Sequence, residues 1–206
     1  LSSRVREVKH QLQRFGQEVH VGMAWSVLNE VPPEKQPAWE FLTLSANPPL
    51  TQHELAEYLP SMRNEHSQRW VSVQPLERGE YSTSVRASDL IYRMLAAKMH
   101  GAEGIFVSDP ISTARGLMND DGTPGELLLP WRTTALALSG AEYLGSLRLE
   151  HGSQNHVFVR DGQAVMVVWN DRSLEEKLYL GEDVRQTDIW GRRSVPPRIQ
   201  HQQVIK

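Results

Sequence analysis

Acidic and histidine side chains are the residues of this chain that could carry chemistry, and their spacing decides which kind. Residues 119–122 (Asn-Asp-Asp-Gly) offer oxygen ligands for Ca²⁺, but they lack the alternating spacing and distal Glu of an EF-hand loop and are typical of a turn. His53 and Glu54 do not form a zinc motif, because the residue four positions after His53 is Glu57. No G-x-S-x-G elbow and no glycine-rich phosphate loop occurs. The sequence therefore predicts no metal site and no cofactor.

Composition limits the class of partner. The chain has 206 residues, 39% hydrophobic and 23% charged, which is enough for one or two globular domains. A net charge of −3 without a Lys/Arg block favours neither a nucleic-acid nor a membrane partner, and no apolar run approaches the roughly 20 residues that span a bilayer. The absence of cysteine excludes disulfides and thiol chemistry and fits any compartment. Because the chain begins with Leu1, we expect a fragment of a longer protein.

Helix-like and strand-like segments alternate through the first part of the chain. Thr51 and Glu54 match a capping box at the start of one helix, and Gly101 is placed to end another. The expected helices cover 3–15, 51–62, 84–100 and 131–144, and the expected strands cover 18–26, 39–46, 69–74 and 104–108. This alternation predicts a parallel sheet. A complete eight-unit (β/α)8 barrel needs about 250 residues, so four β/α units make half of one; a small open α/β sheet is the alternative.

The last part of the chain changes to short strands separated by turn signals. Asp161-Gly162 stands between two apolar strands, which is a strong local signal for a β-hairpin. We expect a small antiparallel β-sandwich here, with Trp169 and Trp190 anchoring its core. The run 164–169 is apolar on both faces, so both faces should be covered. The fold class is therefore α/β plus all-β, with one domain over 1–145 and a second over 146–206.

Several stretches of the sequence carry a family resemblance. The order "GAEGIFVSDP", "LPWRTTALALSGAEYLGS", "HVFVRDGQAVMVVWN" and "VRQTDIWGR" resembles the C-terminal half of a (β/α)8-barrel glycoside hydrolase-like protein with its C-terminal β-sandwich domain. The resemblance covers about residues 69–206, and its motifs are structural rather than catalytic. It implies that the four expected strands are barrel strands five to eight. It also implies two partners: the missing N-terminal half of the barrel and carbohydrate.

The resemblance assigns roles to residues after the third expected strand. In such retaining enzymes the nucleophilic Glu ends strand seven, where this chain has Gln74, with Glu77 and Glu80 following in the loop. The general acid/base would lie before Leu1. A retaining glycosidase needs two carboxyl groups about 5–5.5 Å apart, and an amide cannot attack the anomeric carbon. Glu77 and Glu80 are therefore the candidate catalytic residues, and they compete with a reading as solvated loop carboxylates.

Three residues at strand ends are candidates for substrate binding, namely Trp25, Gln74 and Asp109. Barrel sites form at the C-terminal ends of the strands, so Asp109 could bind a sugar hydroxyl and Trp25 could stack on a sugar ring. Asp before Pro is also a common turn residue, and a tryptophan can equally fill a core. We expect carbohydrate hydrolysis or binding at this rim, with the isolated segment inactive. The alternative is a non-catalytic barrel and sandwich protein that binds glycans or supports a larger assembly, and Gln74 favours it.

Overall fold

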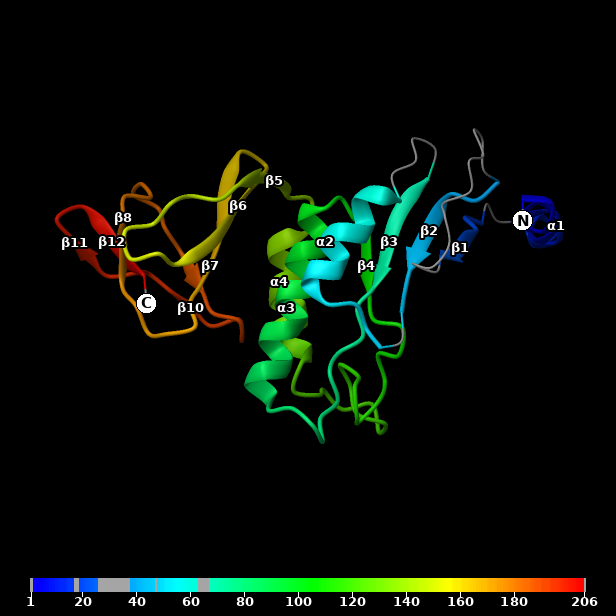
Figure 1. The fold of residues 1–206 in the computed structure, drawn as a ribbon, viewed down its shortest axis with the longest axis horizontal. Helices are drawn as coiled ribbons and strands as arrows, with labels where there is room; N and C mark the ends of the chain where they lie inside the picture. The colour runs from blue at the N-terminus through cyan, green and yellow to red at the C-terminus, as the bar shows by residue number, and fades with distance from the viewer. Residues whose placement is uncertain (1, 17–18, 26–37, 47, 63–66, 206) are drawn as a thin grey trace. The chain divides into compact units, whose positions relative to one another are not determined.

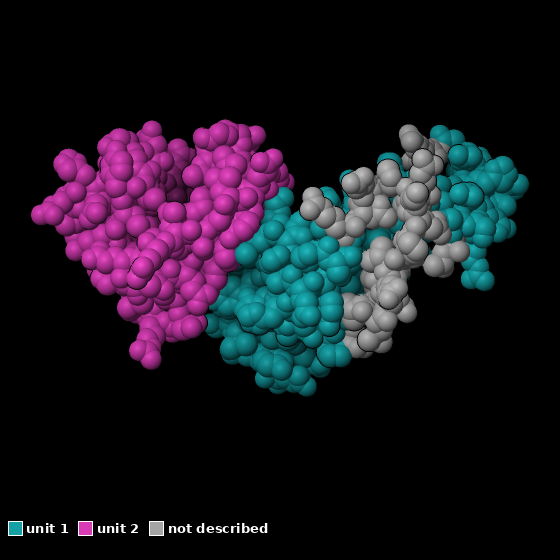
Figure 2. Space-filling model, turned by 45° about the horizontal axis from the view of Figure 1, so that its top comes forward, with its two compact units in different colours: residues 1–127 teal, residues 128–206 magenta. Residues whose placement is uncertain are grey.

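The structure is a computed structural model that describes residues 2–16, 19–25, 38–46, 48–62 and 67–205. The chain divides into two units, Leu1–Leu127 and Leu128–Lys206, which Figure 2 shows in two colours. The domain boundary expected from the sequence, between residues 145 and 146, stays a prediction. Within the described ranges, no helix combines the length and the apolar character that a membrane crossing requires.

The first unit contains a parallel sheet. Its strands are β1 (Gly22–Trp25), β2 (Phe41–Leu44), β3 (Gln68–Ser72) and β4 (Gly104–Phe106), in the spatial order β1-β2-β3-β4 (Figure 1). Each neighbouring pair is parallel. The predicted parallel sheet is confirmed, with strands shorter than the sequence indicated. Closure into a barrel is not shown, because in the described residues these strands form a single row.

Two helices connect the last three of these strands and lie on one side of the sheet (Figure 1). α2 (Gln52–Ser61) begins at the predicted capping box: Thr51 Oγ1 accepts from the Glu54 backbone N–H, and the Glu54 carboxylate accepts from the Thr51 backbone N–H at 2.8 Å. α3 (Thr83–Met99) begins after Ser82 and ends before Gly101, whose φ of +85° suits a residue without Cβ. The capping predictions at Thr51, Glu54 and Gly101 are therefore confirmed.

The N-terminal helix is attached differently. α1 (Ser2–Gln13) has no buried residue, and Phe15, expected on its apolar side, is 79% exposed. An ion pair between Lys9 and Glu40 links α1 to the residue before β2. Glu40 also accepts a hydrogen bond from the Val21 backbone N–H, so it joins the entries to β1 and β2 as well.

The two faces of the parallel sheet differ in burial. Leu42, Leu44 and Val71 share one face and are at most 1% exposed, which matches burial beneath α2 and α3. Phe41 and Trp70 lie on the opposite face and are half-buried. Their rings stack with centroids 3.9 Å apart and planes 13° apart. The helix-covered face is the core of this unit, and the other face presents aromatic rings.

Glycines on the neighbouring strands make room for these rings. A Cβ on Gly22 would come within 1.9 Å of the Phe41 ring, and a Cβ on Gly104 would come within 2.8 Å of the Trp70 ring. Phe106 on β4 adds an edge contact to Trp70, with centroids 6.3 Å apart. We call Phe41, Trp70 and Phe106 the aromatic face. Glycine at positions 22 and 104 lets its rings lie flat against the neighbouring strands.

The second unit is mainly antiparallel. It contains α4 (Leu128–Leu138), a sheet of β5 (Glu142–Gly145), β6 (Gln154–Arg160) and β7 (Gln163–Trp169), and a sheet ordered β11-β12-β8. The latter strands are Arg198–Ile199, Gln202–Ile205 and Glu176–Leu178, and β9 (Gln186–Thr187) pairs with β10 (Arg193–Ser194). The antiparallel character predicted from the sequence is confirmed. Its packing as a sandwich stays a prediction.

The predicted helix over 131–144 is wrong in its second half. α4 ends at Leu138, Gly140 has a φ of +68°, and Glu142–Gly145 pairs with β6 as a strand. Apolar residues recur beyond this break, at Ala141, Tyr143 and Leu144, so apolar spacing alone did not reveal it. The glycine in a left-handed conformation is the physical reason that the helix stops.

The β6–β7 hairpin forms as predicted. Asp161 and Gly162 have φ of +50° and +73° and connect strands paired from Arg160–Gln163 onward, which is the conformation of a type I′ turn. Burial in this hairpin differs from the expectation. Gln163 and Ala164 are exposed and residues 165–169 of β7, including Trp169, are only half-buried, because β6 is the one strand paired with β7 in the described residues.

Phenylalanine rather than tryptophan anchors the core of this unit. Phe158 on the central strand β6 is fully buried. Trp190 is half-buried and lies in the turn between β9 and β10, where Asp188 accepts a hydrogen bond from its backbone N–H at 3.0 Å. The prediction that Trp169 and Trp190 lie in the core is therefore wrong. Burial here depends on the position of the residue in the sheet and not on the size of its side chain.

Candidate functional site

The carboxyl ends of β3 and β4 form a polar edge in the first unit. Val73 continues the pairing beyond β3, its backbone N–H donating to the Phe106 carbonyl at 2.8 Å. The next residue, Gln74, is half-buried, and its Oε1 accepts a hydrogen bond from Ser108 Oγ at 3.0 Å. We call Gln74 and Ser108 the sheet-edge pair. Their adjacency follows from parallel pairing, which brings the carboxyl ends of neighbouring strands together.

Two buried arginines of α3 fix the chain that follows β3. Arg93, 2% exposed, donates from Nη1 to the Gln74 carbonyl at 2.7 Å and pairs with Asp89 one helical turn away. Arg86, also 2% exposed, donates from Nε to the Leu76 carbonyl at 2.9 Å. Arginine suits this role because its donors diverge and remain charged when buried. The backbone at Gln74 and Leu76 is therefore held by α3.

Glu126 completes this support. Its carboxylate accepts from Arg78 at 2.9 Å, from Arg86 at 3.0 Å and from Thr83 Oγ1 at 3.0 Å. Burial lowers the pKa of Arg86, and the charge of Glu126 opposes that shift. Sequence reasoning did not find Glu126, because it is 40 residues from Arg86 and no local pattern connects them. The only sequence feature that pointed to Glu126 was an acidic residue standing alone at the end of a long loop.

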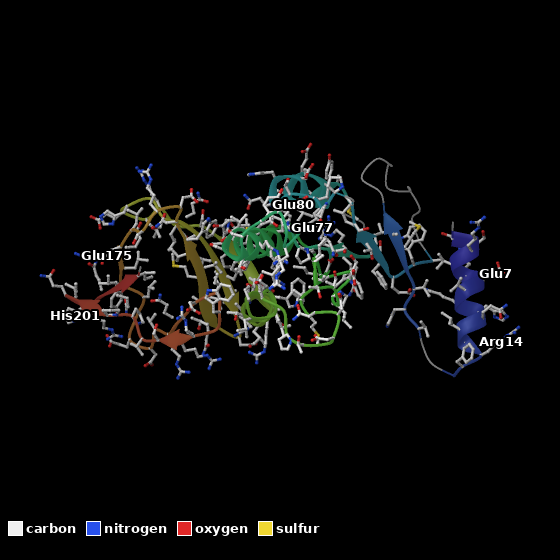
Figure 3. All side chains as sticks on the ribbon, turned by 90° about the horizontal axis from the view of Figure 1, so that it is seen from below. Glu7, Arg14, Glu77, Glu80, Glu175 and His201 are labelled. Carbon is white, nitrogen blue, oxygen red and sulfur yellow. The ribbon has the colours of Figure 1, made fainter. Side chains whose placement is uncertain are left out.

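The predicted catalytic carboxylates lie in the loop between β3 and α3. The Glu77 side chain is 39% exposed, and its Oε2 accepts from Arg115 at 2.7 Å. That hydrogen bond and the charge of Glu77 raise the pKa of Arg115. Glu80 is exposed, and its backbone N–H donates to the Glu77 carbonyl at 3.2 Å; both residues are labelled in Figure 3. Glu77 is thus part of an ion pair, and Glu80 shares its turn.

The two other predicted binding residues have less defined surroundings. Asp109 follows Ser108 at the end of β4 and is exposed, as expected for a residue at the rim of the sheet. Trp25 ends β1, but its side chain lies outside the described residues. The strand ends therefore place Gln74 and Asp109 at the same edge, while the structure gives no side-chain geometry for Trp25.

The acidic run over 119–122 is a turn, as the sequence indicated. The Gly122 backbone N–H donates to the Asn119 carbonyl at 2.9 Å, and Asp121 accepts from the backbone N–H and hydroxyl of Thr123. These Thr123 bonds lower the pKa of Asp121. In the described part of the chain, no group of three His, Asp or Glu side chains is placed to hold a metal ion.

The sheet-edge pair offers hydrogen bonding, and Asp109 adds a carboxylate at the same edge. Gln74 brings an amide, Ser108 a hydroxyl and Asp109 an exposed carboxylate. An amide nitrogen donates, its oxygen accepts, and neither forms a stable ester with a sugar. Glu77, the first carboxylate after β3, is bonded to Arg115.

Comparisons with known proteins support the fold. No protein-family model matches the chain, and no curated protein matches it. A solved structure of a family 39 glycoside hydrolase from the gut symbiont Bacteroides cellulosilyticus WH2 is similar, with a TM-score of 0.57 and 15% sequence identity. The similarity covers 77% of this chain but only 36% of that enzyme's chain. At this identity the likeness shows a glycoside hydrolase-like fold, consistent with part of a larger barrel protein.

Proposed function

We propose that this chain is the C-terminal part of a glycoside hydrolase-like barrel protein that binds carbohydrate at the edge of its parallel sheet without cleaving it. The observation that supports this proposal best is the sheet-edge pair itself. Gln74 follows the strand that the family resemblance would assign to barrel strand seven, and its side chain bonds to Ser108. Amide and hydroxyl groups at a strand end suit the hydroxyls of a sugar.

Hydrolysis requires more than this edge offers. A retaining mechanism needs one carboxylate as nucleophile and a second carboxyl group about 5–5.5 Å away as acid/base. Gln74 cannot supply the first. Glu77 comes three residues later, and its Oε2, the atom that would have to attack, already accepts a hydrogen bond from Arg115 at 2.7 Å.

The remaining strands of the barrel are the proposed partner of the aromatic face. Phe41, Trp70 and Phe106 stay half-buried, although residues on the opposite face are fully buried. The similarity covers only 36% of the similar enzyme's chain, which agrees with this chain being part of a larger protein. Strands on the missing side would bury these rings, at about 25 cal/mol for each Å² of apolar surface covered.

The second candidate function is hydrolysis with Glu77 as nucleophile. One observation favours it: Glu77 lies in the loop at the carboxyl edge of the sheet, and its side chain remains 39% exposed. The backbone nearby is rigidly held by Arg86, so Glu77 could be positioned reproducibly. Under this hypothesis, Arg115 would have to release the carboxylate when a glycoside binds.

Two measurements separate these functions. The chain is incubated with 4-nitrophenyl β-xyloside and 4-nitrophenyl β-glucoside, and release of nitrophenolate is followed. In parallel, the side-chain amide of Gln74 is followed by NMR during titration with xylotetraose and cellotetraose. We expect no turnover and a saturable shift of the Gln74 resonance.

The controls use changes outside and inside the edge. Gln163→Ala removes an exposed glutamine from β7 and should leave the Gln74 response unchanged. Ser108→Ala removes the hydrogen bond to Gln74 and should weaken sugar binding about fivefold, as expected for one neutral hydrogen bond. Turnover that Glu77→Gln abolishes and Glu80→Gln retains would instead support the hydrolase.

A further inference from the structure

The second unit contains a pocket that the sheet-edge proposal does not use. It has a volume of about 260 Å³ and lies where β6 begins and β7 ends. Its walls include Trp169, His156, Gln154 and Ser146, and the chain between β5 and β6 closes one side. The pocket is smaller than the roughly 300–1,000 Å³ usual for drug-sized ligands, so it suits a single ring.

Strand register brings the pocket's side chains onto one face of the β5-β6-β7 sheet. Gln154 pairs directly with Trp169, and His156 lies two residues along β6 on the same face. The rings of His156 and Trp169 have centroids 5.1 Å apart at 47°. Tyr143 of β5 meets His156 edge-on, its Oη 3.3 Å from Nδ1. An aromatic wall thus stands next to an exposed amide.

The other end of this face is closed. Arg160, at the far end of β6, donates to the Leu136 carbonyl of α4, and Phe158 beside it is fully buried. The face is therefore core near α4 and open near Gln154. The aromatic wall begins where this core ends. The ring of Tyr143 packs against the fully buried Phe158, with ring centroids 5.3 Å apart, and this contact helps to hold Tyr143 in place.

Buried polar groups hold the rim of the pocket in place. Asn155 is 4% exposed, accepts from the Leu147 backbone N–H at 2.9 Å and donates to the Leu147 carbonyl at 2.7 Å. Glu176 accepts from the Ser153 backbone N–H at 3.0 Å and from its hydroxyl at 2.7 Å. Both sides of the 147–153 loop are therefore fixed before any ligand arrives, which reduces the entropy lost on binding.

The geometry points to a second carbohydrate site here, in which one neutral pyranose ring of a glycan packs against Trp169 and His156. Among the residues that the structure describes, the lining includes no Asp, Glu, Lys or Arg, which disfavours an ionic ligand. A pyranose has an apolar C–H face for the aromatic wall and hydroxyls at its edge for Gln154 and Ser146. This site does not depend on the sheet-edge proposal, since none of its residues belongs to the first unit.

The test follows the Trp169 indole N–H by NMR in the full 206-residue chain. The Trp169→Phe spectrum assigns that resonance, and unchanged remaining peaks show that the fold is kept. Xylotetraose and cellotetraose are titrated separately. We expect a saturable shift with at least one of them, with a dissociation constant on the order of 1 mM. Gln154→Ala should weaken binding about fivefold, as expected for one lost hydrogen bond. Gln163→Ala, at the other end of the same hairpin, should leave it unchanged.

Three results would overturn the proposal. The first is no shift of the Trp169 resonance with either sugar, and the second is a shift that Gln154→Ala leaves unaltered. The third is a shift that follows protein concentration without sugar, which would make the face a contact between protein chains. A response at Gln74 alone would retain the sheet-edge proposal and reject this one, and a response at Trp169 alone would do the reverse.

Discussion

Removing the buried carboxylate of Glu176 should destabilise the second unit. Its side chain is 2% exposed, and three donors point to it: the Ser153 backbone N–H, the Ser153 hydroxyl and the His151 backbone N–H. A hydrogen bond to a charged group contributes about 1.5–3 kcal/mol, and water entering the space would replace part of the loss. We therefore expect Glu176→Ala to lower the free energy of unfolding by about 3–5 kcal/mol.

The substitution Glu176→Gln separates the effect of the negative charge from the effect of the side-chain shape. Glu176→Gln keeps an oxygen where Oε1 accepts from Ser153 but puts an NH₂ group in place of Oε2, which lies 3.5 Å from His151 Nδ1. We expect a loss of about 1–2 kcal/mol. Glu150→Gln removes the same charge from an exposed position and should change stability by less than about 0.5 kcal/mol.

Urea unfolding measures these differences, and hydrogen exchange of the Ser153 amide locates them. A Glu176→Ala chain as stable as the Glu150→Gln control would contradict this expectation, because it would mean that the three hydrogen bonds make no net contribution to stability. Faster exchange across the first unit with an unchanged Ser153 amide would refute the assignment to the second unit.

The same carboxylate gives the stability a pH dependence. Burial opposes ionisation of Glu176, but the bonds from Ser153 and His151 outweigh it and hold the pKa below the ordinary 4.5. Stabilisation from a lowered pKa is fully present above the unfolded-state pKa and is lost as pH falls through the folded-state pKa. Acidification below about pH 4.5 should therefore reduce unfolding free energy more steeply in the native chain than in Glu176→Gln.

Three further substitutions test the fold by urea unfolding. Gly162→Ala should cost about 1–2 kcal/mol because φ is +73°, and a neutral effect would contradict the turn. Gly22→Ala should cost about 1–3 kcal/mol because its Cβ would lie 1.9 Å from the Phe41 ring; no loss would show that Phe41 moves freely. Arg93→Met should cost about 2–4 kcal/mol and speed exchange near Gln74, whose carbonyl it binds; unchanged exchange there would separate Arg93 from the edge.

Local sequence signals predicted the elements well where a few adjacent residues decide the structure. Thr51 with Glu54 started a helix, and Asp161 with Gly162 made a hairpin, because capping and turn geometry involve only near neighbours. The helix expected through residue 144 failed at Gly140, where one left-handed residue outweighed favourable apolar spacing.

Burial and contacts between distant residues could not be predicted in the same way. Trp169 is half-buried because β7 is an edge strand of its sheet. The order of strands in a sheet cannot be read from the residues of one strand, so this burial could not be predicted. At the candidate site, the sequence predicted that Gln74 and Glu77 follow the third strand. It could not predict that Arg115 pairs with Glu77 or that Arg86 binds Glu126, since these contacts join residues 38 and 40 positions apart.

The proposed carbohydrate-binding edge is tested most directly by NMR titration of the Gln74 side-chain amide with xylotetraose and cellotetraose. We expect a saturable shift of that resonance, weakened when Ser108→Ala removes the 3.0 Å hydrogen bond, with the sugar recovered intact. An unresponsive Gln74 amide would contradict carbohydrate binding at this edge. If the sugar is shortened in a reaction that requires Glu77, the proposal that this chain does not hydrolyse carbohydrate is contradicted.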